Sequence, residues 1–452
     1  MNDIRTGGLS TSRARLAAGG WSLAGNLVGA LLPYVVVLVV ANTAVTDAYF
    51  IASTVMLFVA HLLATCVEAV LVPYAVRTQM HVGSRLRHLL WMRPIRNLLL
   101  LSVCGGVIAA VVASVWLAAS SDGLAAIPRE VSLSLMALVG LPAVSTLSGI
   151  VGSGLHAQGR FGLTNATRGL RSLLAAVLVI TLGDEVGVLA AAVGLLGGEL
   201  LRATVLITAH RRMFRPRTAG AVAAFEAKRE RSPSLWRWFA PHLMAASAAS
   251  AMSLVDVAVA SWLGRGAVTV LVLAEKAYAG PLVLVTACVC SVSGAVWSQG
   301  LQRGSSWTWL KQDYLAVQRD LARWSVPGAL LGCCVLPILL WVGLAESLVG
   351  TALATELVLT VAILLIAVPL AAWTTVATRL LVVVGETRRL PRLTIGALVI
   401  NLVASVLLAW PLGVVGIALG ILGVRVGTAM VHHRVALSAL DEPKADQHDA
   451  WV

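Results

Sequence analysis

Two copies of one apolar, glycine-spaced segment decide the fold: VGVLAAAVGLLGGELLRAT at residues 186–204 and LGVVGIALGILGVRVGTAM at residues 412–430. The copies lie 226 residues apart, which is half of the 452-residue chain, and seven of their nineteen positions are identical without a gap. Three glycines stay in register between the copies. The chain is therefore expected to consist of two related halves.

Composition places these halves in a membrane. Hydrophobic residues make up 58% of the chain and charged residues only 12%, whereas a soluble protein carries about a quarter charged residues. The net charge of +13 would suit a nucleic-acid partner, but the basic residues sit in short loops between apolar runs, so no nucleic-acid partner is expected. Their bias toward arginine, with abundant Ala, Val, Leu and Gly, indicates a GC-rich bacterial genome.

Twelve segments are long and apolar enough to cross the bilayer, which takes about 20 residues of helix. They lie near 17–41, 48–76, 97–119, 131–156, 169–183, 186–209, 237–262, 268–298, 324–345, 354–384, 393–410 and 413–432. We expect an all-α polytopic membrane protein of two six-helix, pseudo-symmetric bundles. Its predicted parts are an N-terminal six-helix lobe (1–209), a basic cytoplasmic linker (210–236), a C-terminal six-helix lobe (237–434) and a cytoplasmic tail (435–452).

The distribution of basic residues supports this count. Thirty of the 34 Lys and Arg residues fall on one side of the predicted membrane, and only Arg129 and Arg265 fall on the other. Because cytoplasmic loops carry the excess of Lys and Arg, both termini are predicted to be cytoplasmic, in a bacterial plasma membrane. Each half then has the same orientation, as in parallel-repeat transporters with substrate sites between the halves.

Charged residues inside the predicted spans mark candidate functional positions. Each costs roughly 2.5–3.5 kcal/mol at a helix centre, so it is expected to face a cavity or a partner. For Asp256 two interpretations stay open, a functional site and a packing pair with Lys276. Glu275 and Lys276 are adjacent, so they point about 100° apart on a helix and cannot line one cavity face together. The candidates are Glu68, Glu199, Asp256, Glu275, Lys276 and Arg425.

Other candidates are weighed against simpler roles. Glu68 and Glu199 lie toward the cytoplasmic side, where pairing with loop arginines explains them as well as gating or ion coupling does. Arg425 occupies the repeat position of Glu199, so a pair across the pseudo-twofold axis is one arrangement. His61, a candidate substrate contact, is more often a satisfied polar residue. Asp47 marks the outer start of its span, where capping competes with gating or coupling.

Neither a cofactor nor a metal site is expected. The six cysteines fall in or beside apolar segments, without the paired spacing and histidine partners of a zinc site. The ATP-binding pattern G-x-x-x-x-G-K-[ST] does not occur. Transport would therefore be coupled to Na⁺, to H⁺ or to the membrane potential.

Six segments carry a resemblance to a known family. They are TDAYFIAS at 46–53 (followed by Glu68), GLHAQGRF at 154–161, LVDVAVASWLGRGAV at 254–268, LAEKAYAGPL at 273–282, VVGETRRLP at 383–391 and PLGVVGIAL at 411–419. These resemble helices of the MurJ-type (MviN) lipid II flippases, a branch of the MOP flippase superfamily, over most of the chain. In its eighth helix that family has an acidic–basic pair, which Glu275–Lys276 matches in both signs.

Two features differ from the lipid II branch. Its members have arginines on helices 1 and 2 that are thought to hold the diphosphate, whereas WSLAGNLVGALLPY and STVMLFVAHLL contain none. Its members also have fourteen helices, and this sequence predicts twelve. The resemblance implies a MATE/MurJ-like fold around a central cavity.

The expected function is transport and not catalysis. The chain would flip a polyprenyl-diphosphate-linked saccharide, such as a lipid II-like peptidoglycan precursor, from the inner to the outer leaflet by alternating access. Lys276 would contact the anionic head group, and Asp256 and Glu275, also candidates for substrate binding, would tune its charge or carry a coupling cation. Membrane lipids and enzymes of cell-envelope (cell-wall) biosynthesis are the expected partners. A MATE-type exporter of a small amphiphile or natural product and an inactive flippase-like scaffold are the alternatives; a membrane enzyme would need larger outer loops.

Overall fold

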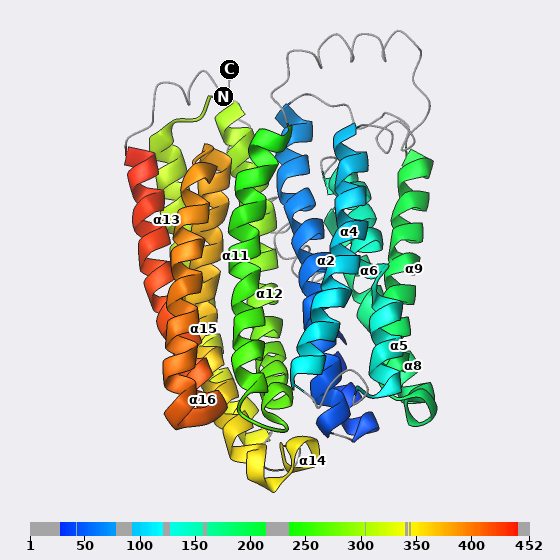
Figure 1. The fold of residues 1–452 in the computed structure, drawn as a ribbon. Helices are drawn as coiled ribbons and strands as arrows, with labels where there is room; N and C mark the ends of the chain where they lie inside the picture. The colour runs from blue at the N-terminus through cyan, green and yellow to red at the C-terminus, as the bar shows by residue number, and fades with distance from the viewer. Residues whose placement is uncertain are drawn as a thin grey trace. The chain divides into compact units, whose positions relative to one another are not determined.

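The computed structural model of the chain describes residues 28–41, 43–77, 93–120, 127–156, 161–213, 235–302, 304–339, 342 and 345–441. Within these residues every regular element is a helix (Figure 1). The described part of each of the twelve predicted spans is helical, which confirms the predicted all-α fold; residues 17–27 of the first predicted span lie outside the described residues. Most of the predicted linker, 214–234, and the last part of the predicted tail, 442–452, lie outside the described residues.

The chain divides into two compact units. The N-terminal unit is Tyr34–Leu254, and the C-terminal unit combines Met1–Pro33 with Val255–Val452. Both boundaries fall inside helices, because the helix Val28–Val40 and α11 (Leu235–Ser261) each run from one unit into the other. The predicted boundaries of the two lobes, at the central linker, remain a prediction.

The N-terminal unit is a helical bundle built around α2 and α9. Apolar side chains from α2, α4, α6 and α11 form one of its cores, which includes Cys66, Leu98, Ile150 and Phe239. The helix α2 packs against α4 and α6, while α8 packs along α9. The helices are α2 (Thr43–Arg77), α4 (Arg93–Ser120), α5 (Arg129–Leu138), α6 (Leu141–His156), α7 (Phe161–Ala166), η2 (Thr167–Gly169), α8 (Leu170–Val186) and α9 (Leu189–Met213).

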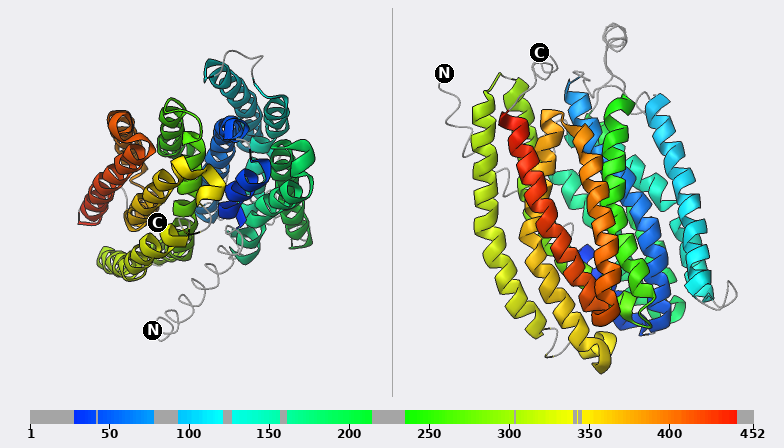
Figure 2. Two further views of the ribbon diagram at one scale, coloured as in Figure 1. Left: turned by 90° about the horizontal axis from the view of Figure 1, so that it is seen from below. Right: turned by 60° about the vertical axis from the view of Figure 1, so that its left-hand side comes forward.

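The C-terminal unit is arranged around α15, which packs against α12, α13 and α16. The long α16 is a helical hairpin, because its backbone leaves the helical conformation at Gly413. Figures 1 and 2 show the two arms of α16, orange and red, running side by side. The helices are α12 (Ala267–Gln302), α13 (Trp307–Leu339), α14 (Ala345–Val349), α15 (Thr351–Val384), η4 (Thr387–Arg389) and α16 (Leu390–Asp441).

Long apolar helices with exposed apolar faces are the form in which a chain crosses lipid. On α4, Ile108, Val111 and Val115 recur at helical spacing and are 58–63% exposed. In water such a face would be unfavourable, whereas against hydrocarbon it is matched to its surroundings. Seven stretches of the described helices are long and apolar enough to span a membrane: Ala44–Glu68, Ile95–Ala119, Arg129–Leu155, Leu189–Arg211, Phe239–Ser261, Leu353–Val384 and Thr387–Asp441.

The internal repeat has a structural counterpart in the backbone. Gly187 ends α8 with φ 59° and ψ −138°, and Gly413 turns the α16 hairpin with φ 59° and ψ −142°. These angles are essentially restricted to glycine. A glutamate lies beside each turn, Glu130 at Gly187 and Glu356 at Gly413, and the two glutamates are separated by the same 226 residues as the glycines. Both halves therefore contain the same helix–turn–helix unit.

We expect Gly187→Ala to destabilise the protein more than Gly413→Ala. Both substitutions place an alanine at a positive φ, at a cost of about 1–3 kcal/mol. A Cβ at Gly187 would in addition lie 1.7 Å from Glu130 Oε2, whereas a Cβ at Gly413 would lie 3.7 Å from Glu356 Oε1. Thermal unfolding in detergent, followed by tryptophan fluorescence, measures the difference. Adding Glu130→Ala to Gly187→Ala should recover part of the loss; equal losses for the two single variants would contradict the Glu130 contact.

Candidate functional site

In the C-terminal unit a buried carboxylate is held by two polar side chains. Asp256 of α11 is 2% exposed. Asn401 and Ser405 stand one turn apart on the first arm of α16, so their side chains face the same side. Asn401 Nδ2 donates to Asp256 Oδ1 at 2.9 Å, and Ser405 Oγ donates to the same oxygen at 2.8 Å. We call Asp256, Asn401 and Ser405 the Asp256 cluster.

Further charges surround the Asp256 cluster. Glu275 of α12 and Arg425 of the second arm of α16 interact electrostatically with the Asp256 carboxylate, and both also act on Tyr278 of α12. Glu275 and Arg425 are partly buried. The C-terminal unit thus brings three of the predicted site residues together. Two carboxylates and one guanidinium in a membrane-embedded unit can bind a cation, exchange a proton or hold a charged ligand group.

Lys276 follows Glu275 on α12 and is also partly buried. Adjacent helical residues point about 100° apart, so Lys276 faces a different direction from Glu275. The hydrogen bonds that the structure describes for Asp256 come from Asn401 and Ser405. The alternative that Asp256 is a packing partner of Lys276 stays a prediction.

In the N-terminal unit, glycines bring α9 against the start of α8. A Cβ at Gly194 would lie 2.3 Å from Ala175 Cα, and one at Gly198 would lie 2.5 Å from Arg171 Cα. The pair is a small-x-x-x-small motif, which lets helix backbones approach closely. This close approach places Arg171, in the first turn of α8, next to Glu199 of α9.

A chain of alternating charges results, which we call the arginine–glutamate network (Arg168, Glu68, Arg202, Glu199 and Arg171). Arg168 Nη2 donates to Glu68 Oε2, and Glu68 Oε1 lies 3.6 Å from Arg202 Nη2. Arg202 Nη1 donates to Glu199 Oε1 at 3.1 Å, and Glu199 Oε2 lies 4.0 Å from Arg171 Nη1. Glu199 is fully buried. Glu68 and Glu199 are thus joined through one shared arginine.

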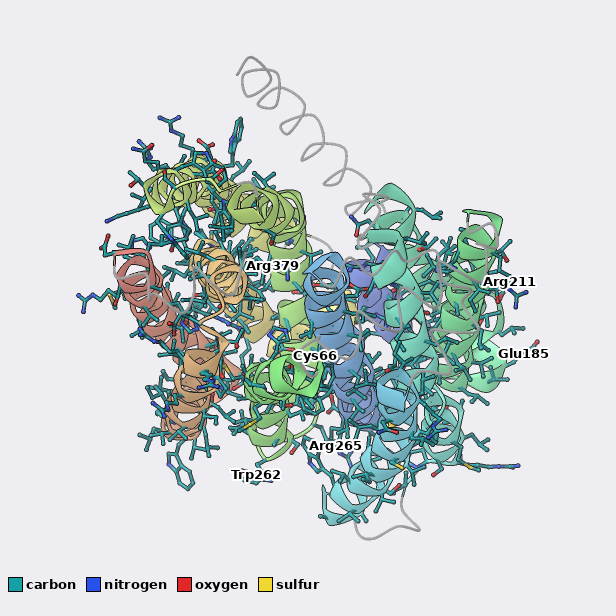
Figure 3. All side chains as sticks on the ribbon, turned by 90° about the horizontal axis from the view of Figure 1, so that it is seen from above. Cys66, Glu185, Arg211, Trp262, Arg265 and Arg379 are labelled. Carbon is teal, nitrogen blue, oxygen red and sulfur yellow. The ribbon has the colours of Figure 1, made fainter. Side chains whose placement is uncertain are left out.

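The arginines of the network are buried or partly buried, unlike some charged residues at the edge of the unit. Arg211, further along α9, is exposed, as is Glu185 at the end of α8. Figure 3 shows both at the outer edge of the N-terminal unit. The predicted alternative for Glu68 and Glu199, pairing with arginines, is present within this unit. Glu199 and Arg425 each have charged neighbours in their own unit.

The two remaining predicted residues, His61 and Asp47, lie on α2. His61 is exposed and Asp47 is partly buried. The expected capping role of Asp47 is wrong, because α2 begins four residues earlier, at Thr43. Asp47 therefore sits one turn inside the helix, past the position whose side chain caps the first N–H groups.

Five residues of these two sites were not identified as site residues from the sequence. Asn401 and Ser405 are neutral, and their signal was only a pair of polar residues four apart in an apolar span. The arginines were counted as part of the basic excess on the cytoplasmic side. The spacing of Glu199 and Arg202, three residues apart inside one span, is the signal that could have separated Arg202 from loop arginines. The five are Arg168, Arg171, Arg202, Asn401 and Ser405.

No protein-family model matches the chain, and no curated protein matches it by sequence. Solved structures do match over nearly the whole chain. A MATE transporter in complex with MaL6 has a TM-score of 0.69 at 16% identity, over 95% of this chain and 96% of its own. A MOP-superfamily transporter from Pyrococcus furiosus, described as having a binding pocket of reversed polarity, has a TM-score of 0.68 at 17% identity, over 96% and 97%.

The lipid II flippase MurJ, in an inward closed conformation, matches with a TM-score of 0.64 at 14% identity, over 95% of this chain and 89% of MurJ. At these identities the likeness shows the fold. The chain has the helical fold of the MOP-superfamily transporters and is a multi-pass membrane protein. MATE transporters and MurJ both share this fold, so the specific resemblance to the MurJ branch remains a prediction.

We expect Glu199→Gln to destabilise the protein far more than Asp441→Asn. Removing one partner of a buried ion pair costs about 3–5 kcal/mol, because the other charge stays buried. Glu199 is 0% exposed, whereas Asp441 pairs with Lys311 at 2.5 Å with side chains 55% and 37% exposed. Such a surface pair contributes about 0–1 kcal/mol. Thermal unfolding of both variants in the same detergent checks this, and a small effect of Glu199→Gln would mean that the network does not hold α8, α9 and α2 together.

Proposed function

We propose that this chain is a secondary transporter that moves a polyprenyl-diphosphate-linked saccharide from the inner to the outer leaflet of a bacterial plasma membrane. The observation that carries the proposal is the Asp256 cluster, a buried carboxylate with Glu275 and Arg425 beside it in one helical unit. The fold shared with MATE transporters and MurJ supports transport by alternating access. The excess of arginine on one side supports cytoplasmic termini.

The proposed roles follow from the charge of each side chain. Lys276 carries an ammonium group, which binds phosphate as a point charge, so we assign it to the diphosphate. Asp256 and Glu275 would take the coupling ion, Na⁺ or H⁺, since carboxylate, amide and hydroxyl oxygens are the ligands that hard cations accept. Arg425 would act as the gating charge that responds to whether Asp256 is neutralised.

Coupling to an ion gradient or to the membrane potential can supply the energy for transport. One elementary charge that crosses the membrane potential gains about 2.3 kcal/mol per 100 mV. A cation that neutralises Asp256 also removes the cost of a buried charge, so its binding and release can shift the balance between two states of the transporter. The direction of coupling follows from which state exposes Asp256 to the outer side.

Native mass spectrometry with a polyprenyl-diphosphate disaccharide tests the substrate. We expect a bound adduct with the full-length protein in mild detergent, and about a tenfold weaker adduct for Lys276→Ala, since one charge-assisted contact is lost. Lys311→Ala, which removes an exposed lysine of the same unit, is the matched control and should bind as the unmodified chain does. Unchanged binding and transport by Lys276→Ala at equal expression would remove Lys276 from the mechanism.

Asp256→Asn tests the coupling ion. In proteoliposomes we expect transport by this variant to lose its dependence on the Na⁺ or H⁺ gradient, because the neutral amide carries no charge to balance a cation and cannot exchange a proton. Ser405→Ala removes one of the two described hydrogen bonds and should weaken the ion dependence without abolishing it. Full ion dependence in Asp256→Asn would move the coupling site elsewhere.

A MATE-type exporter of a small amphiphilic cation is the second candidate. The proximity of the two carboxylates Asp256 and Glu275 favours it, because together they attract a positively charged substrate. Efflux of ethidium from the same proteoliposomes, with no adduct of the lipid-linked saccharide, would select this function. If neither substrate binds, a scaffold without transport activity becomes the better description.

A further inference from the structure

The arginine–glutamate network carries more positive than negative charge. It contains three guanidinium groups and two carboxylates, joined in the order Arg168, Glu68, Arg202, Glu199 and Arg171. Arg171 is the last residue in this series of ion pairs. Its described charged neighbours are one carboxylate, Glu199, and two other guanidinium groups, those of Arg202 and Arg168. An unbalanced positive charge at this depth is costly unless a further anion is bound.

Hydrogen bonding shows the same imbalance. The ion pair of Arg171 Nη1 with Glu199 Oε2 spans 4.0 Å, which exceeds hydrogen-bond distance. Among the described residues, Arg171 Nε and Arg202 Nε are buried and have no hydrogen-bond acceptor. The amide nitrogen of Asn165, a residue of α7 that is 3% exposed, has none either. These three buried nitrogen donors lack an acceptor among the described residues, whereas buried donors are normally hydrogen-bonded.

The two outer arginines of the network, Arg168 and Arg171, can be reached by a ligand. The side chains of Arg168 and Arg171 are 33% and 27% exposed, whereas Glu199 behind them is 0% exposed. Arg168 and Arg171 are three residues apart on consecutive helical turns, so they lie on one face. Arg168 lies in η2 and Arg171 in the first turn of α8, at the end of this helix that the arginine bias assigns to the cytoplasmic side.

We propose that Arg171 and Arg168 form a binding site for a phosphate group that enters from the cytoplasmic leaflet or the cytosol. A phosphate offers several oxygen acceptors to planar guanidinium groups and supplies the missing negative charge. Arg202 positions the site, because it holds Glu68 and Glu199 behind the two outer arginines. The site belongs to the N-terminal unit alone and does not depend on the substrate proposed for Lys276.

Two sources can supply this group, a phospholipid head group and a soluble diphosphate. Native mass spectrometry of the full chain separates them. The protein is titrated with phosphatidylglycerol or with inorganic diphosphate, and diacylglycerol, which lacks a phosphate, is the lipid control. We expect one retained adduct whose apparent affinity falls about tenfold in Arg171→Gln. Arg211→Gln is the matched control, because Arg211 is an exposed arginine of the same unit (Figure 3). It should bind as the unmodified chain does.

Retention of phosphatidylglycerol alone identifies a lipid site, and retention of diphosphate alone identifies a soluble ligand. Equal binding by Arg171→Gln and the unmodified chain, for both probes, overturns the proposal. Thermal unfolding without added ligand shows whether the Arg171→Gln variant has a folding defect. If Arg171 binds a ligand, Arg171→Gln should be at least as stable as the unmodified chain, and the probe should no longer raise its Tm. If Arg171 is purely structural, the variant should have a lower Tm, and the probe should still raise it. Arg171→Lys should restore part of the binding.

Discussion

A polar group inside a bilayer must find its partner within the protein, because hydrocarbon offers none. Within the helices the backbone N–H and C=O groups bond to each other, and each buried charged side chain needs a specific partner side chain. Asp256 has Asn401 and Ser405, and Glu199 has Arg202. The positions of the helices that carry these residues are therefore coupled to the charges themselves. Both candidate sites are places where this requirement selects one packing of the helices.

Close packing through glycine makes these contacts possible in both units. In the N-terminal unit, Gly198 lets α9 approach the backbone at Arg171. In the C-terminal unit, a Cβ at Gly416 would lie 2.0 Å from Leu408 O, and one at Gly420 would lie 3.2 Å from the backbone nitrogen of Ser405. The two arms of α16 therefore hold each other where Asn401 and Ser405 face Asp256. In each unit a glycine-packed helical hairpin presents the polar side chains of the site.

Much of the fold could be predicted from the sequence, because membrane spans are encoded by long apolar runs that need no tertiary information. The repeat was visible for the same reason that it matters structurally: Gly187 and Gly413 need the same backbone angles. The acidic candidates Asp256, Glu68 and Glu199 were visible because a charge stands out in an apolar run.

The partners of those charges could not be predicted in the same way. Asn401 and Ser405 are ordinary polar residues until the α16 hairpin brings them to Asp256, 145 and 149 residues away in the chain. Arg168 and Arg171 looked like loop arginines because the same basic excess that orients the chain also contains them. The pairing of Arg171 with Glu199 depends on how closely α9 approaches α8, which is a property of the packed helices and not of the local sequence. Asp47 illustrates a related limit, because this helix start predicted from the sequence lies four residues later than the start of α2 in the structure.

The matching turns at Gly187 and Gly413 have a consequence for how such a chain diverges after duplication. The turn and its neighbouring glutamate are kept in both halves, while the equivalent positions Glu199 and Arg425 carry opposite charges. Each half balances the charges at that position with residues of its own unit. A charge reversal in one half therefore did not require a simultaneous reversal in the other. The helix–turn–helix unit could be kept in both halves while the charged residues inside each half changed independently, much as two paralogous genes diverge.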